Sequence, residues 1–252
     1  MYLCTLNTKI MYLIIDIGNT LHKVAVFSEA GELIELCKYR QLTPNRIAQL
    51  FSKHDISHAI LSAVGQYSSL IEDKIRQHCP LMVLSASTSL PFTLRYHTPG
   101  TLGPDRIANA AGAYRLYPGQ NVLSIQLGTC MVCDFINEKK EYLGGSIGPG
   151  IDMRFKALKH YTKKLPEVEK RPAEKLVGTT TEESILGGVM NGICFEIEGM
   201  IAAYQRQYGD IKVLLTGGDA DLLQKSIKFP IFAAPNIVLW GLFEILRYNV
   251  EK

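Results

Sequence analysis

The same local pattern occurs twice in this chain, about 110 residues apart, and it limits the possible folds more than any other feature. The first copy, LIIDIGNTLHKVAVF at residues 13–27, reads as an apolar strand, a polar residue, a turn containing glycine, and a second strand. The second copy, SIQLGTCMVCDF at residues 124–135, has the same order, with Gln126 where the first copy has Asp16. A repeated unit of this kind predicts a chain built from two similar halves.

The elements expected around the two copies follow one order. The first half predicts strands at 11–16, 21–28 and 31–39, a helix from Pro44, and then strand 58–64, helix 66–78 and strand 81–84. The second half predicts strands at 121–126, 130–137 and 140–144, helices at 150–164 and 181–207, strand 212–218, a short helix, a strand near PIFAA and a last helix from Val238.

These elements predict an α/β fold with two βββαβαβ units, at residues 11–117 and 118–252. The helix at 104–117 bridges them, with Pro104 in its first turn. Residues 1–10 read as a possible extension, because Met-Tyr-Leu occurs at Met1 and again at Met11, and either methionine fits as the start.

Composition narrows the class of protein. With 252 residues, 47% of them hydrophobic, the chain can bury a sizeable core. A net charge of +3 argues against nucleic acid as a partner, and no uninterrupted apolar run approaches the roughly 20 residues that span a bilayer. The six scattered cysteines suit a reducing cytoplasm, and Cys130 and Cys133 lie in a strand-like run that points them to opposite faces.

The first turn has the residues of a phosphate loop. Its sequence DIGNT, Asp16 to Thr20, places backbone N–H groups and a hydroxyl at the mouth of a hairpin, where they can wrap phosphate oxygens. The Asp16 carboxylate fits such a site if a divalent metal lies between it and the phosphates, and Lys23 adds positive charge. An ordinary tight hairpin turn is the alternative.

Two further glycine-rich stretches are candidates for the same cleft. GGSIGPG at 144–150 precedes a helix N-terminus, and TGGDA at 216–220 ends a strand. Three glycine turns at strand ends would line one cleft if the two halves face each other. In GPDR, residues 103–106, Asp105 is either a base for a hydroxyl proton or a helix cap, and Arg106 either holds an anionic substrate group or forms a salt bridge.

Taken together, DIGNT (16–20), GPDR (103–106), GGSIGPG (144–150), and GTTT with EESILGG (178–188) resemble the type III pantothenate kinases, a branch of the acetate and sugar kinase, heat-shock chaperone and actin superfamily. The resemblance runs from about Met11 to the C-terminus. It implies two ribonuclease-H-like domains with a nucleotide cleft between them, a cytoplasmic homodimer, and transfer of the ATP γ-phosphoryl group to the 4′-hydroxyl of pantothenate, the first step towards coenzyme A.

The resemblance also implies roles for individual residues. Asp105 would be the catalytic base. Asp16 would bind Mg²⁺, and ATP would contact Asp16, Gly18, Asn19, Thr20, Lys23 and Thr129. Pantothenate would contact Tyr96, Gly103, Pro104, Asp105, Arg106 and Thr181.

Position 126 departs from the family pattern. The family has an aspartate there, associated with K⁺ or NH₄⁺ near the phosphates, and a second threonine where this chain has Val132. A neutral amide oxygen can bind a cation, but without the full charge, so we expect weaker cation binding. Two alternatives stay open: a catalytically weak relative that binds nucleotide or pantothenate as a regulator, and another small-molecule kinase of the superfamily.

Overall fold

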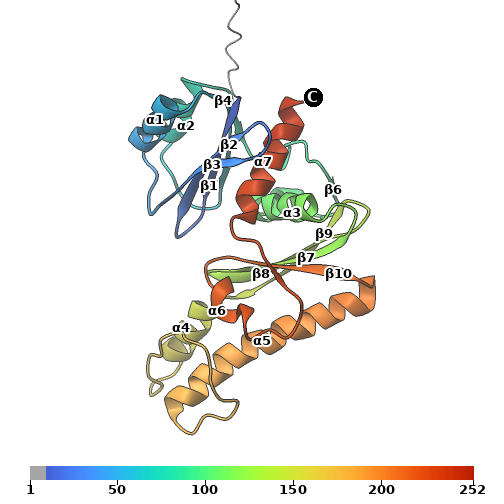
Figure 1. Cartoon of the computed structure of the whole chain (residues 1–252). Coiled ribbons are helices and arrows are strands. Elements are labelled where there is room, and N and C mark those ends of the chain that lie inside the picture. Colours follow the sequence, from blue (N-terminus) through green and yellow to red (C-terminus); the bar gives the residue numbers. More distant parts are fainter. Residues whose placement is uncertain (1–9) are drawn as a thin grey trace, which may run out of the picture. The chain divides into compact units, whose positions relative to one another are not determined.

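The computed structural model describes residues 10–252, so the possible extension at residues 1–10 lies outside the described residues except for Ile10. Contacts divide the chain into two compact units, whose elements are labelled in Figure 1. Unit 1 contains the chain up to Phe92, His97–Arg115 and Val238–Lys252. Unit 2 contains Thr93–Tyr96 and Leu116–Ile237.

Unit 1 is built on a five-stranded sheet. Its elements are β1 (Met11–Ile17), β2 (His22–Ser28), β3 (Leu33–Tyr39), α1 (Pro44–Lys53), β4 (Ile56–Ala63), α2 (Leu70–Arg76), β5 (Leu81–Val83), a 3-10 turn (Pro99–Thr101), α3 (Pro104–Leu116) and α7 (Ile237–Val250). The strand order is β3-β2-β1-β4-β5, with β1, β2 and β3 antiparallel and β1, β4 and β5 parallel. The central strand β1 is almost continuously apolar because both of its faces are covered.

Unit 2 repeats this sheet. Its elements are β6 (Thr93–Leu94), β7 (Asn121–Leu127), β8 (Cys130–Ile136), β9 (Glu141–Pro149), α4 (Ile151–Tyr161), α5 (Thr181–Tyr208), β10 (Ile211–Thr216), α6 (Ala220–Gln224) and β11 (Phe232–Ala233). The strand order is β11-β10-β7-β8-β9-β6. Without β6, this is the order of unit 1 with β7 in the place of β1, so the predicted βββαβαβ repeat is confirmed.

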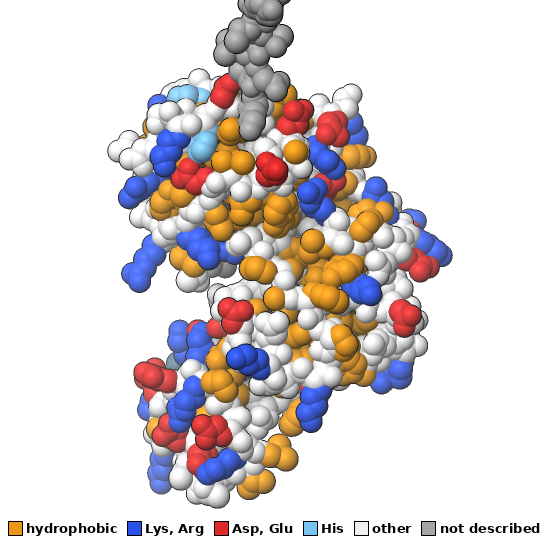
Figure 2. Space-filling model, viewed as in Figure 1, with side chains coloured by type: hydrophobic (Ala, Val, Ile, Leu, Met, Phe, Trp, Pro, Cys, Tyr) orange, Lys and Arg blue, Asp and Glu red, His pale blue; other side chains and the backbone are white. Residues whose placement is uncertain are grey.

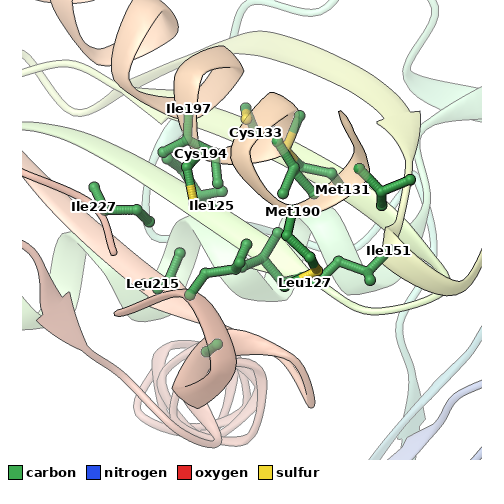
Figure 3. Close-up of a cluster of buried hydrophobic side chains, with 14 of the residues drawn as sticks. Ile125, Leu127, Met131, Cys133, Ile151, Met190, Cys194, Ile197, Leu215 and Ile227 are labelled. Atoms are coloured by element: carbon green, nitrogen blue, oxygen red, sulfur yellow. The ribbon is translucent and has the colours of Figure 1, made fainter. Parts of the chain in front are cut away.

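The core of unit 2 lies between one face of its sheet and helix α5, and Figure 3 shows part of it. Ile125 and Leu127 of β7 point to this face and Ser124 and Gln126 to the other, and Ile193 and Ile197 of α5 are fully buried. By length and composition α5 could cross a membrane, with a mean hydropathy of 1.4 over 18 residues, but half of that window is buried within the protein. This helix is the one predicted at 181–207, and Ile193 and Ile197 place it in the core of unit 2.

The glycine-rich stretch at 144–150 is not a turn, which corrects the sequence analysis. Residues 144–149 belong to β9 and pair with β8. A Cβ atom on Gly145 would lie 1.7 Å from the Cys133 carbonyl oxygen, and Gly144 adopts φ +103° beneath the ring of Tyr96. Gly145 therefore allows the two strands to pair closely, and Gly144 leaves room for the ring of Tyr96. Only Gly150 caps a helix.

Two other features were not expected. Strand β6 has only two residues, too few for a periodicity signal. The last helix, α7, belongs to unit 1, whereas the sequence assigned it to the second half. It packs so closely on α3 that a Cβ on Gly241 would lie 1.7 Å from the Ala108 carbonyl oxygen. The domain limits 11–117 and 118–252 stay a prediction.

Candidate active site

The turn after β1 is held by backbone hydrogen bonds from the two residues that follow β4. The Gly18 N–H donates to the Leu21 carbonyl (3.2 Å), which closes the turn. The Ile17 carbonyl accepts from the N–H groups of Val64 (2.9 Å) and Gly65 (3.2 Å). A Cβ on Gly65 would lie 2.6 Å from the Gly18 carbonyl oxygen, so only glycine allows this approach. Asn19 and Thr20, in the same turn, are exposed to solvent.

A row of polar residues crosses the sheet of unit 1 at this turn. Asp16 on β1 is paired with Lys23 on β2 and with Ser62 on β4, and Lys23 is paired with Lys38 on β3. Paired residues point to the same face of a sheet, so these four side chains share one face. The Ser62 hydroxyl is fully buried and has no hydrogen-bond partner among the described residues.

The electrostatics of the row are unusual. Burial raises the pKa of Asp16 from 3.8 to about 6, the charge of Lys23 opposes this rise, and the charge of Asp105 adds to it. Burial also lowers the pKa of Lys23, although the attraction of Asp16 works in the other direction. Asp16 and Asp105 are therefore close enough to interact, and a cation between them would relieve the cost of their two charges.

Asp105 lies in the first turn of α3, directly after Pro104. Its carboxylate accepts hydrogen bonds from its own N–H and from that of Arg106, which lower its pKa, but the larger effect of burial raises it overall. A Cβ on Gly103 would lie 2.5 Å from Asp105 Oδ1, so glycine is needed for the carboxylate to fold back over the helix N-terminus. Arg106 is buried, with 6% of its surface exposed.

Unit 2 has a corresponding row with little charge. Gln126 on β7 is paired with Val132 on β8 and with Thr216 on β10, and Val132 is paired with Ile147 on β9. At the positions that correspond to Lys38, Lys23, Asp16 and Ser62, unit 2 thus has Ile147, Val132, Gln126 and Thr216, respectively. The Gln126 Oε1 atom is buried and has no hydrogen-bond partner among the described residues.

Three turns of unit 2 meet beside this row. The Leu127 carbonyl, before the turn at Gly128 and Thr129, accepts from the Asp219 N–H (3.2 Å), and the Thr129 carbonyl accepts from the Gly150 N–H (3.2 Å). Gly217 adopts φ +97°, and a Cβ there would lie 2.0 Å from the Leu127 carbonyl oxygen. The turn at Gly128 and Thr129 therefore lies beside Gly150 and Gly217 within unit 2, whereas the common cleft expected for 16–20, 144–150 and 216–220 stays a prediction. The Thr129 side chain is exposed there.

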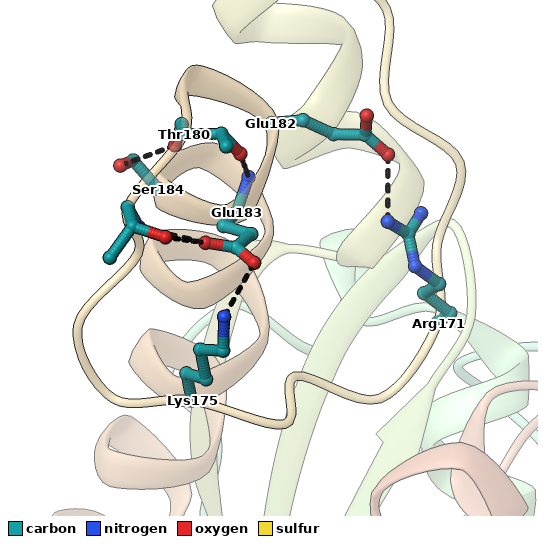
Figure 4. Close-up of polar contacts among 7 residues, drawn as sticks. Arg171, Lys175, Thr180, Glu182, Glu183 and Ser184 are labelled. Carbon is teal, nitrogen blue, oxygen red and sulfur yellow. Dashed lines mark hydrogen bonds and ion pairs between the residues drawn. The ribbon is translucent and has the colours of Figure 1, made fainter.

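Thr181 is the first residue of α5, and its surroundings are shown in Figure 4. The Thr180 Oγ1 atom accepts from the Glu183 N–H (3.1 Å), and the Glu183 carboxylate accepts from the N–H and hydroxyl of Thr179 (2.8 and 2.7 Å). Lys175 donates to the same carboxylate (2.8 Å), and these bonds, the Lys175 bond first, lower the pKa of Glu183 to about 2. The local bonds thus fix the segment that contains Thr181.

Thr181 also borders an open apolar groove of about 1010 Å³ between α4 and α5. Met153, Leu158 and Ile185 supply part of its wall. Tyr96, in contrast, lies at the far end of β9, over Gly144 and 6.2 Å from the ring of Tyr142.

Comparison with known proteins decides the family. The family model for type III pantothenate kinase matches residues 12–203. The chain is 45% identical to the type III pantothenate kinase of Cytophaga hutchinsonii, over 95% of this chain and 100% of that protein. It is 42% identical to the type III pantothenate kinase of Christiangramia forsetii, over 95% and 99%. The chain belongs to the type III pantothenate kinase family.

A solved structure supports the superfamily fold. The ROK family glucokinase of Streptomyces griseus, in complex with glucose and AMPPNP, matches 92% of this chain and 97% of its own with a TM-score of 0.54. The sequence identity is 16%, so this match concerns the fold alone. The two ribonuclease-H-like sheets predicted for this chain are therefore confirmed.

The described residues suit Mg²⁺ bound by few protein ligands. No group of three His, Cys, Asp or Glu side chains that could hold a metal is found in residues 10–252. Mg²⁺ commonly uses one or two carboxylates and takes its other ligands from phosphates and water. Asp16, whose buried charge lacks full compensation, fits that role. The unpartnered Gln126 Oε1 is an oxygen of the kind that binds a monovalent cation.

The sequence motifs did not indicate two hydroxyls beside the turns, those of Ser62 and Thr216. Ser62 lies one residue before the end of β4 and is paired with Asp16, and Thr216 ends β10 and is paired with Gln126. Aligning LSAVG (61–65) with LTGGD (215–219) as repeats would have found them.

Proposed function

We propose that this protein phosphorylates the 4′-hydroxyl of pantothenate with ATP, the first step of coenzyme A synthesis. The observation that carries the proposal is the placement of Asp105 in unit 1. Its partly buried carboxylate is anchored by two backbone N–H groups and interacts with Asp16 at the phosphate-loop turn. A base and a metal-binding carboxylate would thereby lie on one compact unit.

Asp105 would act as the base. The 4′-oxygen of pantothenate attacks the γ-phosphorus of ATP, the bond between that phosphorus and the bridging oxygen breaks, and ADP leaves. The hydroxyl proton passes to the Asp105 carboxylate, whose raised pKa favours accepting it. Phosphoryl transfer depends mainly on alignment and charge neutralisation, so late proton transfer is sufficient.

The phosphates of ATP would be held by the first turn and by Thr129. Gly18, Asn19 and Thr20 offer backbone N–H groups and a hydroxyl, and Lys23 offers a positive charge. Asp16 would hold Mg²⁺, which supplies charge neutralisation for the phosphates when bound. Pantothenate would be held by Tyr96, Gly103, Pro104, Arg106 and Thr181, with the Arg106 guanidinium on its carboxylate.

The monovalent cation of the family would bind weakly here. The row around Gln126 has Val132 and Ile147 where unit 1 has two lysines, and no carboxylate replaces the missing aspartate in that row. A neutral amide attracts a cation far less than a carboxylate does. Turnover in sodium buffer is therefore expected to change little when K⁺ or NH₄⁺ is added.

A cytoplasmic homodimer is part of the proposal. Phe195 on α5 is 57% exposed and Met153 beside the groove is 41% exposed, and a second copy could cover both. The weakly charged row around Gln126 also keeps a second candidate open, a catalytically weak relative that binds nucleotide or pantothenate as a regulator.

The test is ADP release with ATP, Mg²⁺ and pantothenate, compared between wild type and Asp105→Asn. We expect turnover in the wild type and a loss of at least about 100-fold in the variant. Asp221→Asn, an exposed carboxylate on α6, is the matched control. Nucleotide binding without turnover would favour the regulator, and turnover with other hydroxylated substrates but not pantothenate would favour another small-molecule kinase.

A further inference from the structure

Residues 162–180 connect α4 to α5 without any helix or strand. We call this segment the strap. It is fastened by the buried side chain of Val168 and by charged contacts, including the ion pair between Arg171 and Glu182 seen in Figure 4. Figure 2 shows acidic and basic side chains interspersed at this end of unit 2. One residue of the strap, Lys170, makes charged contacts with residues outside α5.

Lys170 of the strap joins two separate parts of unit 2. Its Nζ atom donates to Asp152 Oδ2 at 2.9 Å and to Asp219 Oδ1 at 2.8 Å. Asp152 lies in the first turn of α4, and Asp219 follows the glycines after β10. The Asp219 side chain is only 12% exposed, so its charge depends on this ammonium group more than an exposed carboxylate would.

The two carboxylates belong to the segments that support the second phosphate turn. Asp219 donates its backbone N–H to the Leu127 carbonyl, and Gly150, two residues before Asp152, donates to the Thr129 carbonyl. Lys170 thus fastens together the two segments between which the turn at Gly128 and Thr129 is held. Its ammonium group also reduces the net charge of the two carboxylates from two negative charges to one.

We propose that Lys170 is a positioning residue for the nucleotide, which offsets part of the negative charge on the two segments that support the 127–129 turn so that anionic phosphates can bind there. This inference rests on the proposed function, because it takes that turn to be an ATP-binding element. Lys170 acts through Asp152 and Asp219 and is not itself assigned a contact with ATP.

The charge balance gives the expected size of the effect. Replacing Lys170 by methionine leaves two carboxylates uncompensated near a ligand that carries several negative charges. One extra unit of charge acting through a partly exposed site weakens binding by about threefold to tenfold. The effect should fall on ATP binding, since the turn that Lys170 supports is not among the segments predicted to contact pantothenate.

The experiment measures KM for ATP, KM for pantothenate and kcat in Lys170→Met, together with the equilibrium dissociation constant of Mg·ATP. We expect KM and the dissociation constant for ATP to rise about threefold to tenfold, with kcat and KM for pantothenate within about twofold of wild type. Lys170→Arg should restore ATP binding. The double variant Lys170→Met with Asp219→Asn, which restores the net charge, should recover most of it.

Lys159→Met is the matched control, because Lys159 also contacts the strap, through the Leu165 carbonyl at 3.3 Å, but compensates no carboxylate there. An unchanged KM for ATP in Lys170→Met would overturn the inference, as would equal changes in all three kinetic constants or a double variant no better than the single one. A wild-type protein without turnover or nucleotide binding would overturn the proposed function as well, so the two failures are distinguishable.

Discussion

Replacing Asp16 by asparagine should stabilise the ligand-free protein while it removes activity. Burial raises the pKa of Asp16 from 3.8 to about 6, so the folded protein holds this group as a charge at neutral pH against an unfavourable free energy. A pKa rise of this size corresponds to about 3 kcal/mol at pH 7. Asparagine has nearly the same shape and no charge, and so avoids this cost.

The expected gain is smaller than the full 3 kcal/mol. The attraction of Lys23 is already included in this pKa, but the asparagine amide must itself lose water when it is buried at this position, which costs free energy. We therefore expect Asp16→Asn to raise the free energy of unfolding by about 1 to 2 kcal/mol at pH 7.5, or the midpoint of thermal unfolding by about 2 to 8 °C.

The pH dependence gives the sharper test. Between pH 3.8 and about 6 the folded state binds more protons at Asp16 than the unfolded state does, so the stability of the wild type falls as pH rises through this window. The advantage of Asp16→Asn should accordingly be full above pH 6 and disappear as pH falls towards 4. Mg·ATP should stabilise the wild type and not the variant.

The assay is thermal and urea unfolding at pH 7.5 and pH 4.5, with and without Mg·ATP. Asp221→Asn, on the exposed side of α6, should change the free energy of unfolding by less than about 0.5 kcal/mol at either pH. A variant at Asp16 that is less stable than the wild type at pH 7.5, or equally stabilised at both pH values, would refute the reasoning.

Three further predictions concern glycines and a histidine. Gly103→Ala should reduce kcat at least about tenfold, because its Cβ would displace the Asp105 carboxylate; steady-state kinetics test this, and unchanged kcat would contradict it. Gly241→Ala should lower the free energy of unfolding, measured in urea, by more than about 3 kcal/mol. Gly192→Ala, whose Cβ has open space within α5, should raise it by about 0.5 to 1 kcal/mol. His22 Nδ1 accepts a hydrogen bond from the Leu42 N–H, and burial lowers the pKa of His22 below 6.5. The free energy of unfolding should therefore fall as pH drops below 6.5, and His22→Gln should weaken this dependence.

Much of the fold was predictable because its signals are local. The strand positions in both halves agree with the apolar periodicity to within a few residues, apart from β9, which runs on to Pro149, and the two-residue β6. The repeat predicted two copies of one unit, and the two sheets do share a strand order, apart from the added β6. Asp16 and Asp105 could be named from motifs, although their electrostatic interaction became visible only in the structure.

The sequence by itself determined the two-part α/β repeat, the hairpin turns and the family to which the chain belongs, because each depends on neighbours along the chain. Only the tertiary structure decided why Gly145 must be glycine, which hydroxyls lie beside Asp16 and Gln126, and that Lys170 joins Asp152 to Asp219. These facts depend on distances between segments far apart in sequence. Such distances are set by how the sheet and helices pack, and no local pattern of residues contains them.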